Sequence, residues 1–193
     1  AFDDGTFDLI QKTFDHPKFL IVRSYWDPQK QKDGLILSEQ TNIALSYCRG
    51  DLCLYIQGDE AIHEKDYPNI HNQMIEMLDH PEIQGLVFQY YHFYGNVDVI
   101  KHTRNIYRRE VRIIRNGIGL QSHLDAQGFR FANKKKPLCK QIDAHIYHYG
   151  WARESTIMDR KIKEMDKLYH GKEFERHKNQ FQYRRVWGLR PFK

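Results

Sequence analysis

The pattern of apolar and polar positions predicts short helices and strands in the first part of the chain. Apolar residues at helical spacing from Thr6 to Phe14 predict a helix that ends before Pro17, because proline disfavours helix at the residue before it. A run of strand formers from Phe19 to Val22 predicts a strand, and a second helix is expected from Ser38 to Tyr47. The apolar run from Leu52 to Ile56 indicates a buried strand.

Further elements follow in the rest of the chain. Apolar positions from Ile70 to Leu78 have the spacing of an amphipathic helix that His80-Pro81 ends. Segments dense in aromatic and β-branched residues predict strands from Leu86 to Tyr94, Val111 to Ile114 and Ile142 to Tyr149. A late helix is marked by Met158, Ile162, Met165 and Tyr169. This alternation favours an α/β fold with βαβ units and a mostly parallel sheet, in which some of the later strands run antiparallel.

Composition and charge limit the classes of protein. The 193 residues are 40% hydrophobic and 13% aromatic, which suffices for one core of ordinary domain size. A mean hydropathy of -0.75, without an apolar run of about 20 residues, excludes a transmembrane protein. The net charge of +5 favours contact with phosphates, nucleic acid or acidic lipid headgroups. Cys48, Cys53 and Cys139 lack CxxC spacing and favour a reducing cytoplasm over a disulfide framework.

Two acidic segments carry the candidate chemistry. The buried strand runs into Gln57-Gly58-Asp59-Glu60, and in open α/β sheets ligands bind outside the carboxyl ends of strands. Carboxylate oxygens there suit Mg²⁺ or Mn²⁺, which would bridge the oxygens of a diphosphate. The alternative is that Asp59 and Glu60 begin a helix, where acids favour the N-terminal dipole. Asp3-Asp4-Gly5-Thr6 offers a carboxylate to a nucleotide base or ribose, or caps the helix that follows.

In combination, these segments point to a known family. The acidic turn ahead of a helix, and Gln57-Gly58-Asp59-Glu60 after a helix that carries Thr41-Asn42-Ile43-Ala44-Leu45, resemble the nucleotide-sugar half of a family 2 glycosyltransferase of GT-A type. The later motifs that resemble a bacterial branch of that family are His92-Phe93-Tyr94-Gly95, Arg108-Arg109-Glu110-Val111-Arg112, Asp125-Ala126-Gln127-Gly128-Phe129-Arg130 and His148-Tyr149-Gly150-Trp151. The resemblance extends to about Arg153 and implies a GT-A type sheet, mixed but mostly parallel, flanked by helices.

The resemblance also implies an organisation of the chain. Family members begin with a strand and a loop ahead of the acidic turn, whereas this sequence starts at Ala1 just before that turn. The first strand of the domain is therefore expected to be missing from the sequence. A single glycosyltransferase-like domain over residues 1–193 is expected to consist of a nucleotide-sugar half (1–60), an acceptor half (61–153) and a C-terminal helix with a basic tail (154–193).

The resemblance assigns roles to individual residues. Asp59 with Glu60 stands at the acidic motif that binds Mn²⁺ or Mg²⁺, and His148 is a further metal ligand. His145 competes with His148, but residues an odd number of positions apart on a strand face opposite ways. Asp125 stands where inverting members place the general base that takes the proton of the acceptor hydroxyl. The residues expected to bind the nucleotide sugar are Asp4, Asn42, Asp59 and Arg109.

The implied function is a metal-dependent inverting glycosyltransferase that moves a sugar from a nucleotide diphosphate to a polysaccharide or lipid-linked acceptor, in the synthesis of cell-surface polysaccharide. We expect it in the cytoplasm, with peripheral contact at the inner face of the membrane. The alternative is a basic nucleic-acid-binding module, although nucleic acid is the less expected partner. That alternative depends on the net charge of +5 and on basic and aromatic residues in the tail: Tyr183, Arg184, Arg185, Trp187 and Arg190. A metallohydrolase is disfavoured because the 11 histidines show no HxH or HExxH spacing.

Overall fold

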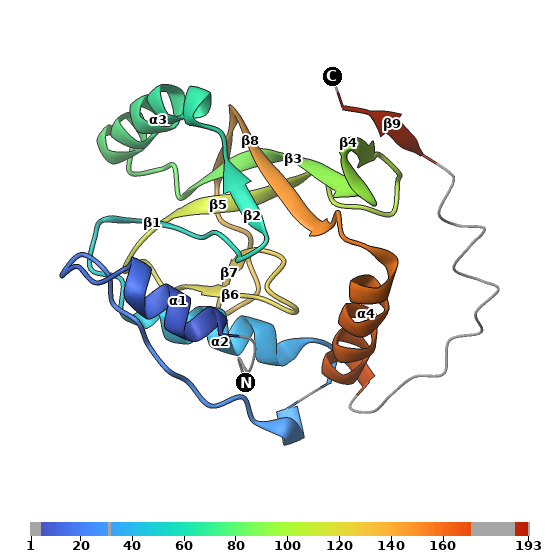
Figure 1. The fold of residues 1–193 in the computed structure, drawn as a ribbon. Helices are drawn as coiled ribbons and strands as arrows, with labels where there is room; N and C mark the ends of the chain where they lie inside the picture. Colours follow the sequence, from blue (N-terminus) through green and yellow to red (C-terminus); the bar gives the residue numbers. More distant parts are fainter. Residues whose placement is uncertain (1–4, 31, 171–187, 193) are drawn as a thin grey trace.

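The chain forms a curved seven-stranded sheet with helices on both of its sides (Figure 1). The computed structural model describes residues 5–30, 32–170 and 188–192. The helices are α1 (Thr6–Thr13), α2 (Leu35–Ser46), α3 (Tyr67–Asp79) and α4 (Ser155–His170), with 3-10 turns at Pro28–Lys30 and Glu64–Asp66. The strands of the sheet are β1 (Leu52–Leu54), β2 (Glu60–Ile62), β3 (Gly85–Tyr94), β4 (Asn96–Lys101), β5 (Arg109–Arg115), β8 (Cys139–Trp151) and β9 (Leu189–Pro191). Strands β6 (Leu120–Ser122) and β7 (Phe129–Phe131) form a separate hairpin.

The sheet is mixed, but it is not mostly parallel as the sequence suggested. Among the described strands, β3 and β8 form a parallel pair, and every other pairing is antiparallel. A parallel pair needs a crossover between neighbouring strands. Helix α3 instead connects β2 with β3, which lie on either side of β8, so the alternation of strand and helix does not produce a βαβ unit. Strands β3 and β4 join directly at Gly95, whose φ of 76° permits the tight turn.

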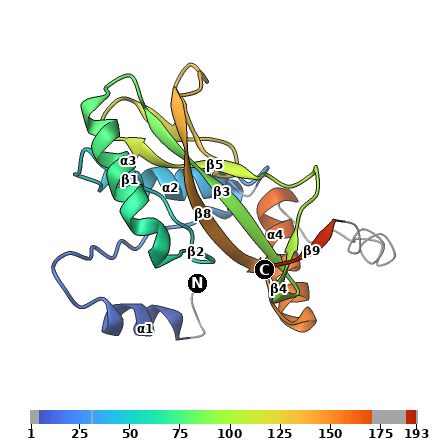
Figure 2. The same cartoon turned by 90° about the horizontal axis from the view of Figure 1, so that it is seen from above.

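The four predicted helices are all present, and one predicted strand is not. Helix α2 begins at Leu35, before the expected start at Ser38, while α1, α3 and α4 match the apolar spacing. The expected strand from Phe19 to Val22 is wrong, because this segment pairs with no described strand and Leu20 is 67% exposed. An apolar run becomes a strand only where a neighbouring strand accepts its hydrogen bonds. Figure 2 shows α1 and the segment after it standing apart from the sheet, and α1 has no buried residue.

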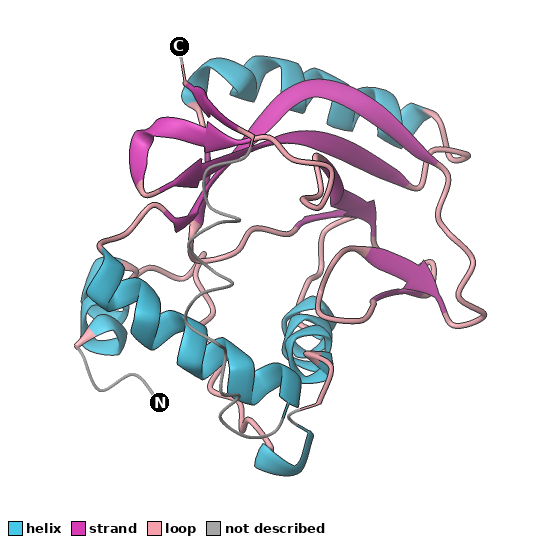
Figure 3. Cartoon of the chain, turned by 90° about the vertical axis from the view of Figure 1, so that its right-hand side faces the viewer, coloured by secondary structure: helices cyan, strands magenta, loops and turns pink. Residues whose placement is uncertain are grey.

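Two apolar clusters hold the helices against the strands. On one side, Ile70 and Met77 of α3 pack against Leu86 and Phe88 of β3 and further side chains of β5 and β8. The second cluster joins β1, β5 and the β6–β7 hairpin, with Leu45 of α2 against it. Figure 3 shows α3 along the outer side of the sheet and the other helices on the opposite side. The sheet and the helices α2 and α4 therefore face each other across the interior that contains the site.

The two halves expected from the sequence share one sheet. Strand β1 of the first half pairs with β5 of the second. Asp59 and Glu60 begin no helix, because Glu60 is the first residue of β2. Asp4 and the tail residues 183–187 lie outside the described residues. Over the described ranges, no helix has both the length and the apolar character needed to cross a bilayer.

Candidate active site

A cavity of about 800 Å³ lies between the sheet and the helices α2 and α4. Aromatic side chains of Tyr55, Tyr107 and Trp151 form part of its wall. Ionisable side chains in the wall include Asp59, Glu110, Arg112, Asp125, His148 and Lys161. Cavities of this size, with apolar walls and a few convergent polar groups, are typical of small-molecule sites.

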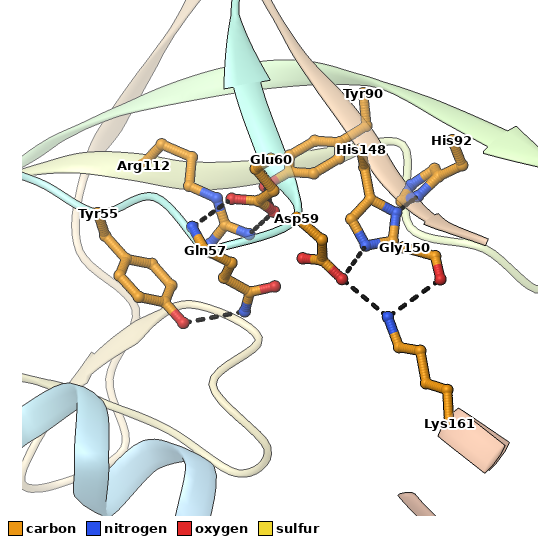
Figure 4. A network of polar contacts seen from close by, with 10 residues as sticks. All are labelled: Tyr55, Gln57, Asp59, Glu60, Tyr90, His92, Arg112, His148, Gly150 and Lys161. Carbon is orange, nitrogen blue, oxygen red and sulfur yellow. Dashed lines mark hydrogen bonds and ion pairs between the residues drawn. The ribbon is translucent and has the colours of Figure 1, made fainter. Parts of the chain in front are cut away.

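At one end of the cavity, Asp59 lies between a lysine and a histidine (Figure 4). The Nζ of Lys161 donates to Asp59 Oδ2 at 2.8 Å, and His148 Nε2 lies 3.7 Å from the same oxygen. Burial alone would raise the pKa of Asp59, but the hydrogen bond and charge of Lys161 and the influence of His148 lower it overall. Asp59 is therefore a carboxylate at neutral pH.

A chain of hydrogen bonds sets the proton positions on His148. His92 Nε2 lies 2.7 Å from the carbonyl oxygen of Tyr107, which can only accept, so this nitrogen carries the proton. Burial lowers the pKa of His92 to about 4, so the ring is neutral and its Nδ1 is an acceptor. The Nδ1 of His148, 3.0 Å away, is therefore the donor. Burial also lowers the pKa of His148, which leaves a free lone pair on Nε2 facing Asp59.

Gly150 allows these groups to come together. It lies two residues after His148 on β8, and a Cβ at this position would be 2.6 Å from both Asp59 Oδ2 and His148 Nε2. Any side chain here would therefore push the carboxylate and the imidazole apart. The carbonyl oxygen of Gly150 also accepts from Lys161 Nζ at 3.0 Å, so this carbonyl and Asp59 Oδ2 hold the ammonium group together.

Glu60 is the neighbour of Asp59 but points into the protein interior. Its Oε1 accepts from Arg112 Nη2 and from the Tyr90 hydroxyl, each at 2.8 Å, and its Oε2 accepts from the backbone N–H of Gln57 at 3.0 Å. The side chains of Glu60 and Arg112 are 0% and 2% exposed. The guanidinium of Arg112 also lies over the rings of Tyr55 and Tyr90. Both oxygens of Glu60 are thus occupied by protein donors, and its arrangement does not fit a metal ligand.

Asp125 and Glu110 are two further acidic residues of the cavity wall. Asp125 Oδ2 accepts from the Tyr169 hydroxyl at 2.6 Å and from Gln127 Nε2 at 3.3 Å. Its Oδ1 is buried and has no hydrogen-bond partner among the described residues. Burial raises the pKa of Glu110 to about 7, and the charge of Asp125 adds to the effect while Arg112 and Arg130 oppose it. These two residues therefore present one unpaired carboxylate oxygen and one carboxyl group that titrates near neutral pH.

Other residues singled out in the sequence lie outside the cavity. The amide of Asn42 bonds the backbone of Ser122 on β6, at 2.7 Å to its N–H and 3.4 Å to its carbonyl, and so ties α2 to the hairpin. Arg109 is exposed and absent from the cavity wall. His145 stacks on Tyr91 and lies near Asp66, so His148 is the histidine that faces the site. The structure thus brings together Asp59, His148 and Asp125.

Lys161 and Glu110 have no role among the expectations from the sequence, although the pattern of each segment contains a signal for them. Lys161 falls at helical spacing between Met158 and Met165, so it places a charge on the apolar stripe of α4. Glu110 and Arg112 are two positions apart on β5, next to the apolar residues Val111, Ile113 and Ile114. Charged residues at positions that the periodicity assigns to the interior mark candidate site residues.

The donor atoms of the cavity wall include two that suit a metal ion. Within the described residues, no group of three or more His, Cys, Asp or Glu side chains is arranged to hold a metal ion. Asp59 and His148 supply two suitable ligand atoms, a carboxylate oxygen and an imidazole nitrogen with a free lone pair. A site of this kind needs oxygens from a bound ligand or water to complete the shell.

Comparison with known proteins adds no relative. No protein-family model matches the chain, and a comparison with curated proteins found no match either.

Proposed function

We propose that the chain is a metal-dependent inverting glycosyltransferase, which transfers a sugar from a nucleotide diphosphate to a hydroxyl of a polysaccharide or lipid-linked acceptor. The observation that carries this proposal is that Asp59, His148 and Asp125 line one cavity of about 800 Å³. These are three of the residues to which the family resemblance assigns metal binding and base catalysis. The GT-A type of fold belongs to this proposal, since the mixed sheet flanked by helices defines the α/β class alone.

Asp59 and His148 would hold the metal, Mn²⁺ or Mg²⁺, with the carboxylate as the ligand type that both ions prefer. When bound, the metal would supply positive charge to the departing diphosphate. Glu60 contributes indirectly: its ion pair with Arg112 fixes the turn from which Asp59 projects. The chain of hydrogen bonds from Tyr107 through His92 holds His148 in the tautomer that presents Nε2.

Asp125 would accept the proton of the attacking hydroxyl. Its Oδ1 is the oxygen without a hydrogen-bond partner, while the Tyr169 hydroxyl holds Oδ2 in place. As the bond from the acceptor oxygen to the anomeric carbon forms, the proton passes to Asp125 and the nucleoside diphosphate departs with the electron pair of the broken bond. The aromatic walls of Tyr55, Tyr107 and Trp151 suit the apolar faces of sugar rings.

The test is a thermal-shift titration of the chain with a panel of nucleotide sugars, with and without Mn²⁺. A ligand present at about 100 times its dissociation constant adds roughly 2.7 kcal/mol of stability. We expect one nucleotide sugar to raise the melting temperature only when Mn²⁺ is present. If none does so, the proposal is wrong for this chain.

Two variants then separate binding from chemistry. Asp59→Asn should abolish the metal-dependent shift. Asp125→Asn should keep the shift and stop transfer, followed as release of nucleoside diphosphate in the presence of saccharide acceptors. Asp98→Asn is the matched control, because this carboxylate is exposed on β4. Normal metal-dependent binding by Asp59→Asn, or normal transfer by Asp125→Asn, would contradict the assigned roles.

A further inference from the structure

Lys161 binds the carboxylate oxygen that the proposed metal would also need. Its Nζ contacts Asp59 Oδ2 at 2.8 Å and the carbonyl oxygen of Gly150 at 3.0 Å, and His148 Nε2 lies 3.7 Å from that same Asp59 oxygen (Figure 4). Two of these atoms are the ligand atoms named above. Asp59 Oδ2 therefore faces the ammonium of Lys161 and the imidazole of His148, and the ammonium is the cation that it binds in this structure.

The ammonium of Lys161 and a metal ion would compete for Asp59 Oδ2. A divalent ion binds a carboxylate oxygen at about 2.0–2.6 Å, which is closer than the ammonium of Lys161 lies to Asp59 Oδ2. Two cations held on one oxygen repel each other strongly in a partly buried setting. The Lys161 side chain is 28% exposed and that of Asp59 is 21% exposed, so water screens this repulsion only in part. Entry of the metal therefore requires that Lys161 leave Asp59.

The rest of α4 is anchored separately. Near its C-terminal end, the carbonyl oxygens of Tyr169 and Leu168 accept from the backbone N–H groups of Asp33 and Gly34, at 3.0 and 3.2 Å. The Tyr169 hydroxyl binds Asp125. The contacts of Lys161 hold the middle of the helix to the Asp59 end of the cavity, so α4 connects the two ends of the site. Release of Lys161 would remove the polar contacts of α4 with Asp59 and Gly150, while its C-terminal end stays attached.

We propose that Lys161 is a tethered competitor of the divalent cation: its ammonium group binds Asp59 Oδ2 and so lowers the metal affinity of Asp59 and His148. This inference rests on the proposed function, because it takes Asp59 and His148 as the metal ligands. It adds that metal binding is coupled to the release of α4 from one end of the cavity. The competing cation belongs to the chain itself, so the competition does not depend on protein concentration.

The test is calorimetric titration of the full chain with Mn²⁺ alone, comparing wild type with Lys161→Met. Removing the competitor leaves the Asp59 carboxylate without its counter-charge, so the variant should bind Mn²⁺ about tenfold more tightly or better. Lys163→Met is the matched control, because it removes the same charge from an exposed position of the same helix. The affinity of this control should stay within about twofold of wild type. Equal or weaker Mn²⁺ binding by Lys161→Met would overturn the inference.

A second measurement uses the wild-type chain and does not depend on the folding of any variant. The reactivity of each lysine toward acetylation is followed by mass spectrometry with and without Mn²⁺. Lys161 should become more reactive when Mn²⁺ is added, while Lys163 should not change. An unchanged Lys161 at saturating Mn²⁺ would contradict the competition.

The two proposals fail differently. If Mn²⁺ binds wild type and Lys161→Met equally, and Asp59→Asn loses that binding, the metal site stands and the competition is wrong. If neither wild type nor Lys161→Met binds Mn²⁺, both the metal site and the metal-dependent function are wrong.

Discussion

The Glu60–Arg112 pair supports the sharpest prediction about stability. In Glu60→Met, the guanidinium of Arg112 stays buried beside the Tyr55 and Tyr90 rings without its carboxylate. Breaking one partner of a buried pair costs about 3–5 kcal/mol, because an uncompensated charge remains in the interior. The exposed fractions of 0% and 2% place this pair in that class rather than among surface pairs, which contribute about 0–1 kcal/mol.

The double variant Glu60→Met with Arg112→Met should recover part of this loss. It removes both charges, so what remains is the cost of the donors on Tyr90 and Gln57 that lose their acceptor, about 1–3 kcal/mol each. We expect the two substitutions to interact by at least about 2 kcal/mol in a double-mutant cycle. The assay is urea unfolding followed by tryptophan fluorescence, with the slope compared among variants.

The control is Glu64→Met, whose wild-type side chain is 82% exposed and whose effect should stay within about 0.5 kcal/mol. The reasoning is refuted if Glu60→Met loses less than about 1 kcal/mol, or if the double variant loses the sum of the two single losses. Loss of Mn²⁺ binding by Glu60→Met with unchanged stability would make Glu60 a metal ligand, contrary to its geometry here.

Three further predictions follow from the same site. Gly150→Ala should lower stability by about 1–3 kcal/mol and abolish Mn²⁺ binding in calorimetry, because the new Cβ would lie 2.6 Å from Asp59 Oδ2 and His148 Nε2; unchanged binding would contradict the close approach. Because the pKa of His92 is about 4 in the folded chain and about 6.5 when unfolded, the unfolded state takes up the proton between these values. Stability contributed by the neutral ring is therefore complete above pH 6.5 and falls by up to about 1.4 kcal/mol per unit as the pH drops toward 4. His92→Phe should lose this difference when urea unfolding is repeated across the range, and an equally steep decline would show that His92 is not its source. Arg109→Ala should leave nucleotide-sugar binding unchanged in the thermal-shift assay, because Arg109 is exposed and outside the cavity wall; a clear loss would place it in the site after all.

Most helices and strands could be predicted from the sequence, because the spacing of apolar residues within each segment determines which element it forms. The spacing of Ile70, Met74 and Met77 predicts α3, and the aromatic run from Leu86 to Tyr94 predicts β3, since each pattern reports which side of an element is buried. The pairing of strands, in contrast, depends on residues that are far apart in the sequence. The run from Phe19 to Val22 has the composition of a strand, but the described structure offers it no partner. The direction of β8 against β3 likewise depends on which strands meet, which periodicity does not report.

The residues of the candidate site could also be predicted only in part, because spacing within a segment does not show which distant residues it meets. The odd spacing of His145 and His148 correctly predicts opposite faces of β8, but it does not indicate which face meets the cavity. Glu60 shares its chemistry with Asp59, and the difference between them arises from Arg112, 52 residues away in sequence. Lys161 comes to Asp59 from 102 residues away. These partners are determined by the tertiary fold, so composition and motif spacing alone do not reveal them.

The short strand β2 has only three residues, so its own backbone pairing fixes its register against β8 only weakly. Glu60 is paired opposite His148 in β8, and a shift of one residue would turn every side chain of β2 to the opposite face. Such a slip would exchange Asp59 and Glu60, leaving Arg112 without its buried partner and sending the longer acid into the cavity. The buried ion pair between Glu60 and Arg112 therefore favours the observed register of β2 against β8. Substitutions at positions 60 and 112 are accordingly expected to be tolerated only as compensating pairs.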